Sequence, residues 1–158
     1  MTDVQPTFQP STVSDLLALA GQELGATEWQ EVTQAKVNAF AESTGDHQWI
    51  HTDPARAMTS PYGSTIAHGL YTLSLGPALS ELLLPSGGFA RSVNYGYNKV
   101  RFPAPLPTGT RVRLRADVLT VDDLGDGCAH VVSRHTFERE ESDKPVCVAD
   151  SVARYYQD

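Results

Sequence analysis

The segment from Thr65 to Leu84, TIAHGLYTLSLGPALSELLL, most constrains the fold of this chain. It is apolar almost all round, and only small or hydroxyl-bearing residues interrupt it. A helix without a polar face is normally buried. The ring of Pro77 removes one backbone hydrogen bond and clashes with the preceding turn, so we expect it to kink or divide this helix. The rest of the chain must therefore cover a buried helix.

Four long segments of strand character follow the break PSGG. They lie at 91–102, 110–121, 127–139 and 145–156. Polar and apolar residues alternate in RVRLRADVLTV, as a half-buried antiparallel strand requires. DDLGDG and ESDK, at 122–127 and 141–144, are typical of hairpin turns. A buried helix followed by consecutive strands predicts an α+β fold, with an antiparallel sheet wrapped around the helix.

The N-terminal part of the chain predicts shorter elements. Residues 1–11 are proline-containing and poor in apolar groups, so we expect a poorly ordered tail, with residues 12–158 forming one domain. SDLLALAGQEL predicts a helix with Ser14 as its N-cap. TEWQEV, at 27–32, predicts a short strand.

The next stretch predicts two helices with a short loop between them. Thr33 is expected to cap a helix through QAKVNAFAEST, which Gly45 ends. Asp53 followed by Pro54 is typical of the start of a second helical turn. The loop between these signals is therefore anchored at both ends.

Composition limits the classes of function. The 158 residues carry a formal charge of −7 with a pI of about 5.1, which argues against a nucleic-acid partner. No apolar run reaches the roughly 18 residues that span a bilayer, and no signal-peptide pattern opens the chain, so we expect a cytoplasmic protein without a membrane partner. Cys128 and Cys147 are expected to be reduced packing residues. Without a metal-ligand cluster or a glycine-rich phosphate loop, no cofactor or metal is expected.

The loop sequence TGDHQWIHTDPARA, at 44–57, places an acid and an imidazole five positions apart. Asp46 and His51 have ordinary pKa values of about 3.9 and 6.5, so together they can hold a water, remove one proton and supply another. Alternatively, Asp46 only satisfies a turn and His51 lies on the surface. The pair alone does not decide between these interpretations.

A second motif, GSTIAHGL at 63–70, adds a hydrogen-bond donor. Backbone N–H groups in the first turn of a helix lack partners within the helix. Gly69 has no side chain to obstruct approach, so its N–H could donate to a carbonyl oxygen of a substrate. Close packing of the helix against the sheet is the alternative reason for a glycine here.

Two longer stretches, FAESTGDHQWIHTDPARA and YGSTIAHGLYTLSL, carry the order aromatic, small residues, T-G-D, two residues, apolar, H, and later A-H-G. In this order the chain resembles the MaoC-like dehydratases, also called (R)-specific enoyl-CoA hydratases. With NYGYNKVRFPAPLPTGTRVR, at 94–113, it most resembles the branch of the nodulation protein N. The resemblance extends over nearly the whole chain from Leu16 onwards.

This resemblance implies a single hot-dog fold, in which an antiparallel sheet wraps a long central helix, and a homodimer with a continuous sheet. It implies that Asp46 is the family's catalytic acid and His51 its catalytic histidine, and that the Gly69 N–H polarises a thioester carbonyl. Many members of the family have asparagine and proline where this chain has Gln48 and Trp49. Support of the catalytic pair, or the preference for an acyl chain, is expected to differ accordingly.

The implied reaction is hydration of a trans-2-enoyl thioester, or dehydration of an (R)-3-hydroxyacyl thioester, with water as co-substrate. Gln48 and His68 are further candidates for substrate contact, although His68 could instead form a structural hydrogen bond at the helix entrance. His47 is expected to be loop surface. Lys99 and Arg101 in NKVR lie at i and i+2, on one face of a strand, and could bind the phosphates of CoA or a carrier-bound pantetheine. Arg91 could reach the same region. The alternative is that these cations only form a solvated face of the strand.

Two rival functions remain open. A hot-dog acyl-CoA thioesterase would cleave the thioester itself, and a non-catalytic subunit would only bind acyl thioesters. The spacing of Asp46 and His51 together with A-H-G favours the hydratase. Acyl-chain length, the choice between CoA and carrier protein, and the pathway are not specified by these motifs.

Overall fold

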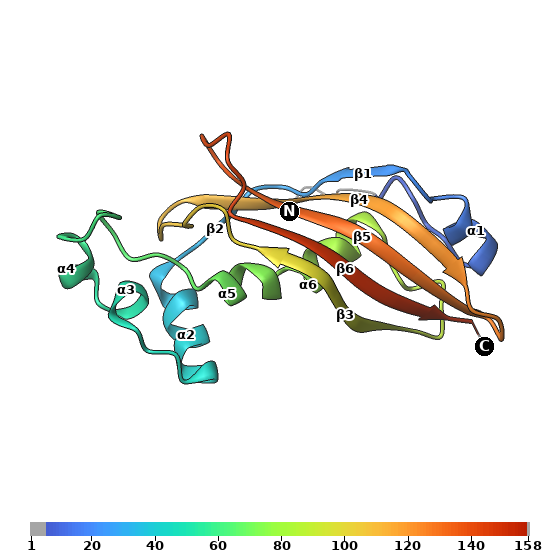
Figure 1. Ribbon diagram of the computed structural model, residues 1–158, viewed down its shortest axis with the longest axis horizontal. Coiled ribbons are helices and arrows are strands. Elements are labelled where there is room, and N and C mark those ends of the chain that lie inside the picture. The colour runs from blue at the N-terminus through green and yellow to red at the C-terminus, as the bar shows by residue number, and fades with distance from the viewer. Residues whose placement is uncertain (1–5, 158) are drawn as a thin grey trace.

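A long antiparallel sheet lies over two short helices in the computed structural model of the protein, which describes residues 6–157 (Figure 1). The helices are α1 (Val13–Leu17), α2 (Gln34–Thr44), α3 (Trp49–Thr52), α4 (Pro54–Ala57), α5 (Gly69–Ser74) and α6 (Gly76–Leu83). The strands are β1 (Glu23–Ala26), β2 (Gln30–Glu31), β3 (Arg91–Arg101), β4 (Arg111–Asp123), β5 (Cys128–Arg139) and β6 (Cys147–Tyr156). The four long strands predicted from the sequence are confirmed, with ends that shift by no more than two residues.

The sheet has the order β1-β4-β5-β6-β3, and β2 pairs with β4 beside β1. All pairings are antiparallel. The predicted turns at 122–127 and 141–144 join β4 to β5 and β5 to β6. The α+β class is therefore confirmed, and β3 forms one edge of the sheet.

The buried helix is divided, as Pro77 predicts. Helix α5 ends at Ser74, and α6 begins at Gly76 with Pro77 in its first turn. Both pack on the same face of the sheet (Figure 1), and α2, α3 and α4 gather at one end of the molecule. The central helix is thus two short helices in place of one long helix.

The expected helical start at Thr65 is wrong. Residues 65–67 are extended, because their backbone groups bond to a neighbouring segment: the Ala67 N–H donates to the Leu106 carbonyl (2.8 Å), and the Thr108 N–H donates to the Thr65 carbonyl (3.0 Å). Ile66 forms a β-bridge with Pro107. The first helical residue is therefore Gly69.

The core lies between the sheet and the helices. In β4 every second residue is buried, as the alternating sequence predicts: Val112, Leu114, Ala116 and Val118. On the neighbouring strand β5, the side chains of Phe137 and His135 are buried beneath α6. A Cβ at Gly76 would lie 3.2 Å from His135 Nδ1, so this glycine lets the helix approach the strand closely.

The N-terminal elements differ in detail from those expected. Thr12, and not Ser14, caps α1: its hydroxyl accepts from the Asp15 N–H (3.1 Å), and the Asp15 carboxylate accepts from the Thr12 N–H (2.9 Å). This start lets Val13 face the core, where it is buried. Of the expected strand at 27–32, only β2 is formed.

The expected disorder of residues 1–11 falls partly outside the described residues, which begin at Pro6. Within this segment Pro10 is buried, and Phe8 packs against the core. Among residues 6–157, no helix has both the length and the apolar character needed to cross a membrane.

Candidate active site

The segment that carries Asp46 and His51 is held between two capped helices. Thr33 caps α2 by accepting from the Lys36 N–H (3.3 Å), and Gly45 ends it in the left-handed conformation, with φ of 77°. The Asp53 carboxylate caps α4 by accepting from the Arg56 N–H (3.0 Å). These three predicted signals are confirmed. His51 itself lies in α3, a helical turn that the sequence had not suggested.

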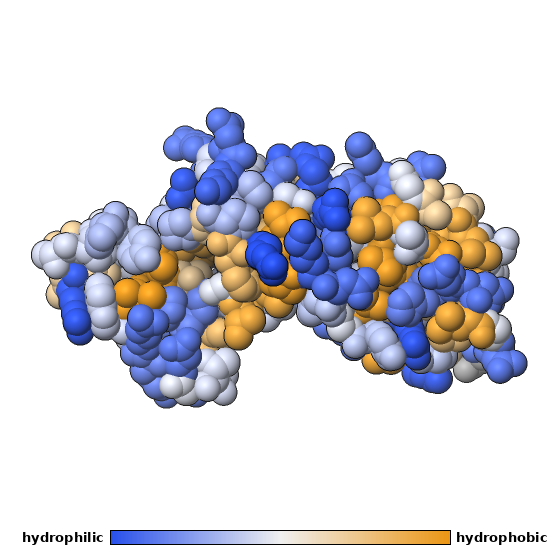
Figure 2. All heavy atoms as spheres, in the orientation of Figure 1, coloured by the Kyte–Doolittle hydropathy of each residue, from blue (hydrophilic) through white to orange (hydrophobic). Residues whose placement is uncertain are grey.

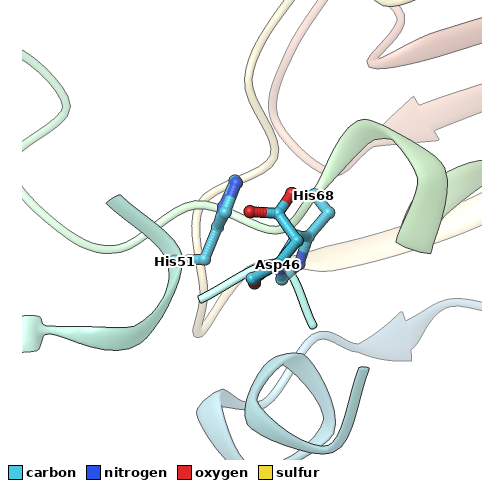
Figure 3. A group of neighbouring side chains, drawn as sticks. All are labelled: Asp46, His51 and His68. Carbon is cyan, nitrogen blue, oxygen red and sulfur yellow. The ribbon is translucent and has the colours of Figure 1, made fainter. Parts of the chain in front are cut away.

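Three titratable side chains converge here, two from this segment and one, His68, from the start of α5. One ligating atom from each of Asp46, His51 and His68 lies within 4.8 Å of the others (Figure 3). His51 and His68 are 7% and 3% exposed, whereas Asp46 is exposed to solvent. One water oxygen at ordinary hydrogen-bond lengths of about 2.7–3.0 Å can therefore bridge the acid and an imidazole.

The hydrogen bond of His51 fixes its tautomer. Its Nδ1–H donates to the Ile66 carbonyl (2.7 Å), so the neutral ring keeps a lone pair on Nε2. Burial lowers the pKa of His51, and the neighbouring His68 adds to this effect, whereas the Ile66 carbonyl and Asp46 oppose it. His51 is therefore a neutral base at neutral pH.

His68 contacts both Asp46 and His51. Its Nε2–H donates to the backbone carbonyl of Asp46 (2.9 Å). Its ring is stacked on His51, with 3.7 Å between the centroids and 25° between the planes, and Phe40 contacts it with a centroid distance of 5.0 Å. Its Nδ1 is buried without a hydrogen-bond partner among the described residues. This geometry supports the expected structural bond at the helix entrance.

The stacking of the two imidazoles does not suit a shared metal ion. A histidine binds a metal in the plane of its ring, with a bond of about 2.0–2.1 Å for zinc. Two rings that are 3.7 Å apart and tilted by only 25° have planes that meet well beyond that distance. The two imidazoles are therefore not arranged to ligate one cation together.

A cavity of about 300 Å³ opens beside His51. Gly69 and Thr72 of α5 line it, together with the segment from Phe102 to Leu106. Its wall is largely apolar, as is usual for sites that bind small molecules. His51 is one of the residues that line the cavity, whereas Asp46 is not.

Gly69 is the first residue of α5, so its N–H has no acceptor within the helix. A Cβ at this position would lie 3.0 Å from the ring of Phe102. The glycine therefore has a packing role, against Phe102. Because it also lines the cavity beside His51, the structure is compatible with both interpretations of this residue.

The other predicted residues are spread out. Gln48 and His47 are exposed. His47 lies on the loop surface, as expected, with its Nδ1 3.7 Å from Glu42 Oε1. Lys99 and Arg101 are exposed on the opposite face of β3 from Val100, which packs against the core, and neither lines the cavity.

The expectation that Arg91 could reach the region of Lys99 and Arg101 is wrong. Arg91 begins the strand that Arg101 ends, about 33 Å away at the usual rise of an extended strand. Its guanidinium instead stacks on Tyr156, 4.1 Å from the ring centroid.

Sequence reasoning missed two residues near the site. Thr72 is 2% exposed and lines the cavity one turn after Gly69, a position that the helical spacing could have indicated. Gln34 of α2 donates from Nε2 to the backbone carbonyl of His51 (2.7 Å). No sequence motif could reveal this contact, because its acceptor is a main-chain atom 17 positions away.

Comparisons with known proteins agree with this architecture. A solved structure, an R-hydratase from Pseudomonas aeruginosa in the unliganded form, superimposes with a TM-score of 0.72 at 21% identity; the match covers 94% of this chain and 87% of that one. The expected hot-dog fold is thereby confirmed.

Two curated relatives align over most of their length. The 3-hydroxyacyl-thioester dehydratase Z of Mycobacterium tuberculosis is 50% identical over 144 residues, which cover 91% of this chain and 95% of the relative. Nodulation protein N of Rhizobium meliloti is 39% identical over 145 residues, covering 90% and 89%. The family model of the MaoC-like domain matches residues 15–139. With most of its length inside that match, the chain belongs to the MaoC-like domain family.

Proposed function

We propose that this protein is a hydro-lyase that adds water to trans-2-enoyl thioesters and removes it from (R)-3-hydroxyacyl thioesters. The observation that carries the proposal is the meeting of the Asp46 carboxylate and the His51 imidazole within 4.8 Å, beside a cavity that Gly69 also lines. The name of the Mycobacterium tuberculosis relative, a 3-hydroxyacyl-thioester dehydratase, supports the same substrate class.

The proposed step needs one water and no cofactor. Asp46 and His51 hold the water, and the lone pair on His51 Nε2 accepts a proton as the water oxygen bonds to C3 of the substrate. The Gly69 N–H donates to the thioester oxygen, which carries the enolate charge. The pair of Asp46 and His51 then returns a proton to C2 from the same face, which completes the addition of H and OH across the double bond. Dehydration uses the same groups in reverse.

The magnitudes fit such an arrangement. Positioned acid–base groups typically contribute about 10²–10⁴ in rate. One preorganised oxyanion donor contributes about 2.7–4 kcal/mol. Neither contribution is sufficient by itself for an efficient enzyme, and this site offers both. The lowered pKa of His51 supports the role of a base that is free of its proton at neutral pH.

The substrate is proposed to be a CoA or carrier-bound thioester of fatty acid metabolism. Its acyl chain would occupy the apolar cavity beside Gly69. Its phosphates would be bound by Lys99 and Arg101, which are exposed on one face of β3. Gln48 is proposed to contact the substrate near Asp46, where its exposed amide is free of any side-chain cap bond.

A homodimer is proposed because one edge of the sheet is open. Among the strands of residues 6–157, β3 pairs with β6 alone. Val93 and Tyr95 on this strand are 44% and 58% exposed, and apolar patches interrupt the polar surface in Figure 2. Light scattering after size exclusion should give twice 17.2 kDa. A single-chain mass, or a complex formed only with a different chain, would contradict the homodimer.

A cytoplasmic location is part of the proposal. Cys128 and Cys147 are buried and free, which suits a reducing compartment. Cell fractionation with an antibody to the protein is the direct test, and recovery in a secreted or membrane fraction would argue against it.

The activity is tested with crotonyl-CoA and the full chain. We expect the absorbance of the enoyl thioester to fall, (R)-3-hydroxybutyryl-CoA to form, and no free thiol to appear. Release of free CoA without hydration would instead identify a thioesterase. Tight binding without turnover of any enoyl thioester from C4 to C16 would identify a binding subunit.

A further inference from the structure

The two residues of the proposed acid–base pair share an unusual feature: each has its main-chain carbonyl held by a side chain from elsewhere. His68 Nε2 donates to the Asp46 carbonyl (2.9 Å), and Figure 3 shows these two side chains next to each other. Gln34 Nε2 donates to the His51 carbonyl (2.7 Å). The backbone of both residues is thereby tied to helices on either side, α2 and the start of α5.

All the hydrogen-bonding groups of the Gln34 amide are used. Its Nε2 donates to the His51 carbonyl and to Asn38 Oδ1 (2.8 Å). Its Oε1 accepts from the Thr65 hydroxyl, which also bonds the Thr108 hydroxyl (2.7 Å). The amide thus connects α2, the segment of His51, and the extended strand that leads to Gly69. A side chain that lacks either the donor or the acceptor cannot make this connection.

His68 combines a hydrogen bond with a stacked ring. Its Nε2–H donates to the Asp46 carbonyl, while its ring is stacked on that of His51 and contacts that of Phe40. At 3% exposure it has little freedom to turn elsewhere. It therefore sets the position of the acid through one atom and supports the base with its ring face.

Asp46 has few other restraints. Its N–H reaches Thr44 Oγ1 at 3.4 Å, and its carboxylate receives the Gln48 N–H at 3.4 Å, both beyond the usual range for such bonds. The side chain is exposed to solvent, so packing does not fix it. The bond from His68 is thus the shortest one that holds this residue, at 2.9 Å.

We propose that Gln34 and His68 are positioning residues that keep Asp46 and His51 at water-bridging distance by holding their main-chain carbonyls. The inference rests on the proposed function for its kinetic consequence, but not for its structural one. Misplacing a reacting group by about 1 Å can cost on the order of a hundredfold in rate. Positions that hold both carbonyls should therefore affect turnover without touching the substrate.

Two variants and a matched control test the proposal. Gln34→Met keeps the length of the side chain and removes its polar groups, and His68→Phe keeps a stacked ring and removes the donor. Asn38→Ala is the control, because Asn38 bonds the Gln34 amide but neither carbonyl. We expect both variants to lower kcat by about tenfold to a hundredfold with little change in KM, and Asn38→Ala to match the wild type. The melting temperature of both variants should stay close to that of the wild type.

Hydrogen–deuterium exchange provides a readout that does not depend on catalysis. Amides of residues 46–51 should exchange about fivefold faster in Gln34→Met and in His68→Phe, the factor expected for one lost hydrogen bond. Unchanged exchange there would overturn the proposal, as would wild-type kcat in both variants or a loss of kcat matched by general unfolding. If the wild type lacks hydratase activity but the exchange pattern appears, the proposed function fails and the positioning role stands.

Discussion

The imidazole of His68 is stacked on that of His51, and the N–H groups of the two rings donate to different backbone carbonyls. His51 Nδ1 donates to the Ile66 carbonyl and His68 Nε2 donates to the Asp46 carbonyl, so the two rings are anchored to different segments. A proton added to His51 would face burial and a neighbouring imidazole together. The stack therefore favours His51 as a base over His51 as a standing cation.

The pH dependence of the reaction should report this environment. The pKa of His51 is lowered below 6.5, so its neutral form persists into mildly acidic solution. In the hydration direction, kcat/KM should decline in acid with a midpoint below pH 6.5. The profile of initial rates with crotonyl-CoA measures this. A decline centred above 6.5 would mean that His51 is not a buried neutral base.

Removing either member of the pair should abolish most of the activity. Asp46→Asn keeps the shape of the side chain and removes its charge, and His51→Ala removes the base; each should lower kcat by at least about a hundredfold. His47→Ala is the control, because His47 is an exposed neighbour in the same loop. Circular dichroism should show an intact fold. Wild-type hydration by Asp46→Asn or His51→Ala would refute the mechanism.

Gly69→Ala should impair the enzyme through Phe102. The added methyl would lie 3.0 Å from that ring, so the ring or the helix must shift and the Gly69 N–H moves relative to the cavity. We expect kcat/KM to fall by at least about tenfold, which is less than the effect of removing an oxyanion donor completely. The double variant Gly69→Ala/Phe102→Leu should recover part of this loss by making room. No recovery would show that the methyl acts directly against the substrate.

Stability should fall in acid because of His135. Burial lowers its pKa to about 4 in the folded protein, against about 6.5 when unfolded, so between these values the unfolded chain binds the extra proton. The free energy of unfolding is therefore unaffected by this group above pH 6.5, and it falls by up to about 3 kcal/mol as the pH is lowered toward 4. Urea denaturation at several pH values measures it. His135→Leu should show a shallower decline than the wild type, and the exposed variant His47→Leu should not.

Local signals predicted much of this fold because they act within a few residues. Alternation placed β4 correctly, Pro77 divided the central helix, and Gly45 and Asp53 marked the ends of the loop. The helical start at Thr65 was wrong for a different reason. Its apolar character is the same in a helix and in a buried extended segment, and only the pairing with residues 106–108 selects the second.

The site divides along the same line. Residue type and spacing made Asp46, His51 and Gly69 candidates, the family resemblance gave them roles, and the structure brings Asp46 and His51 together. Gln34 could not be found, because its partner is a carbonyl that every residue possesses. The stacking of His68 on His51 could not be predicted from the sequence either, because it depends on how the segments that carry the two residues pack in three dimensions.

The pairing of residues 65–67 with residues 106–108 also sets an order of events during synthesis. Asp46, His51 and Gly69 leave the ribosome well before Thr108, which bonds Thr65 from 43 positions further along the chain. A nascent chain that ends after α6 carries every proposed reacting group but not the strand that aligns them. The active centre therefore cannot be aligned until residues 106–108 have been synthesised.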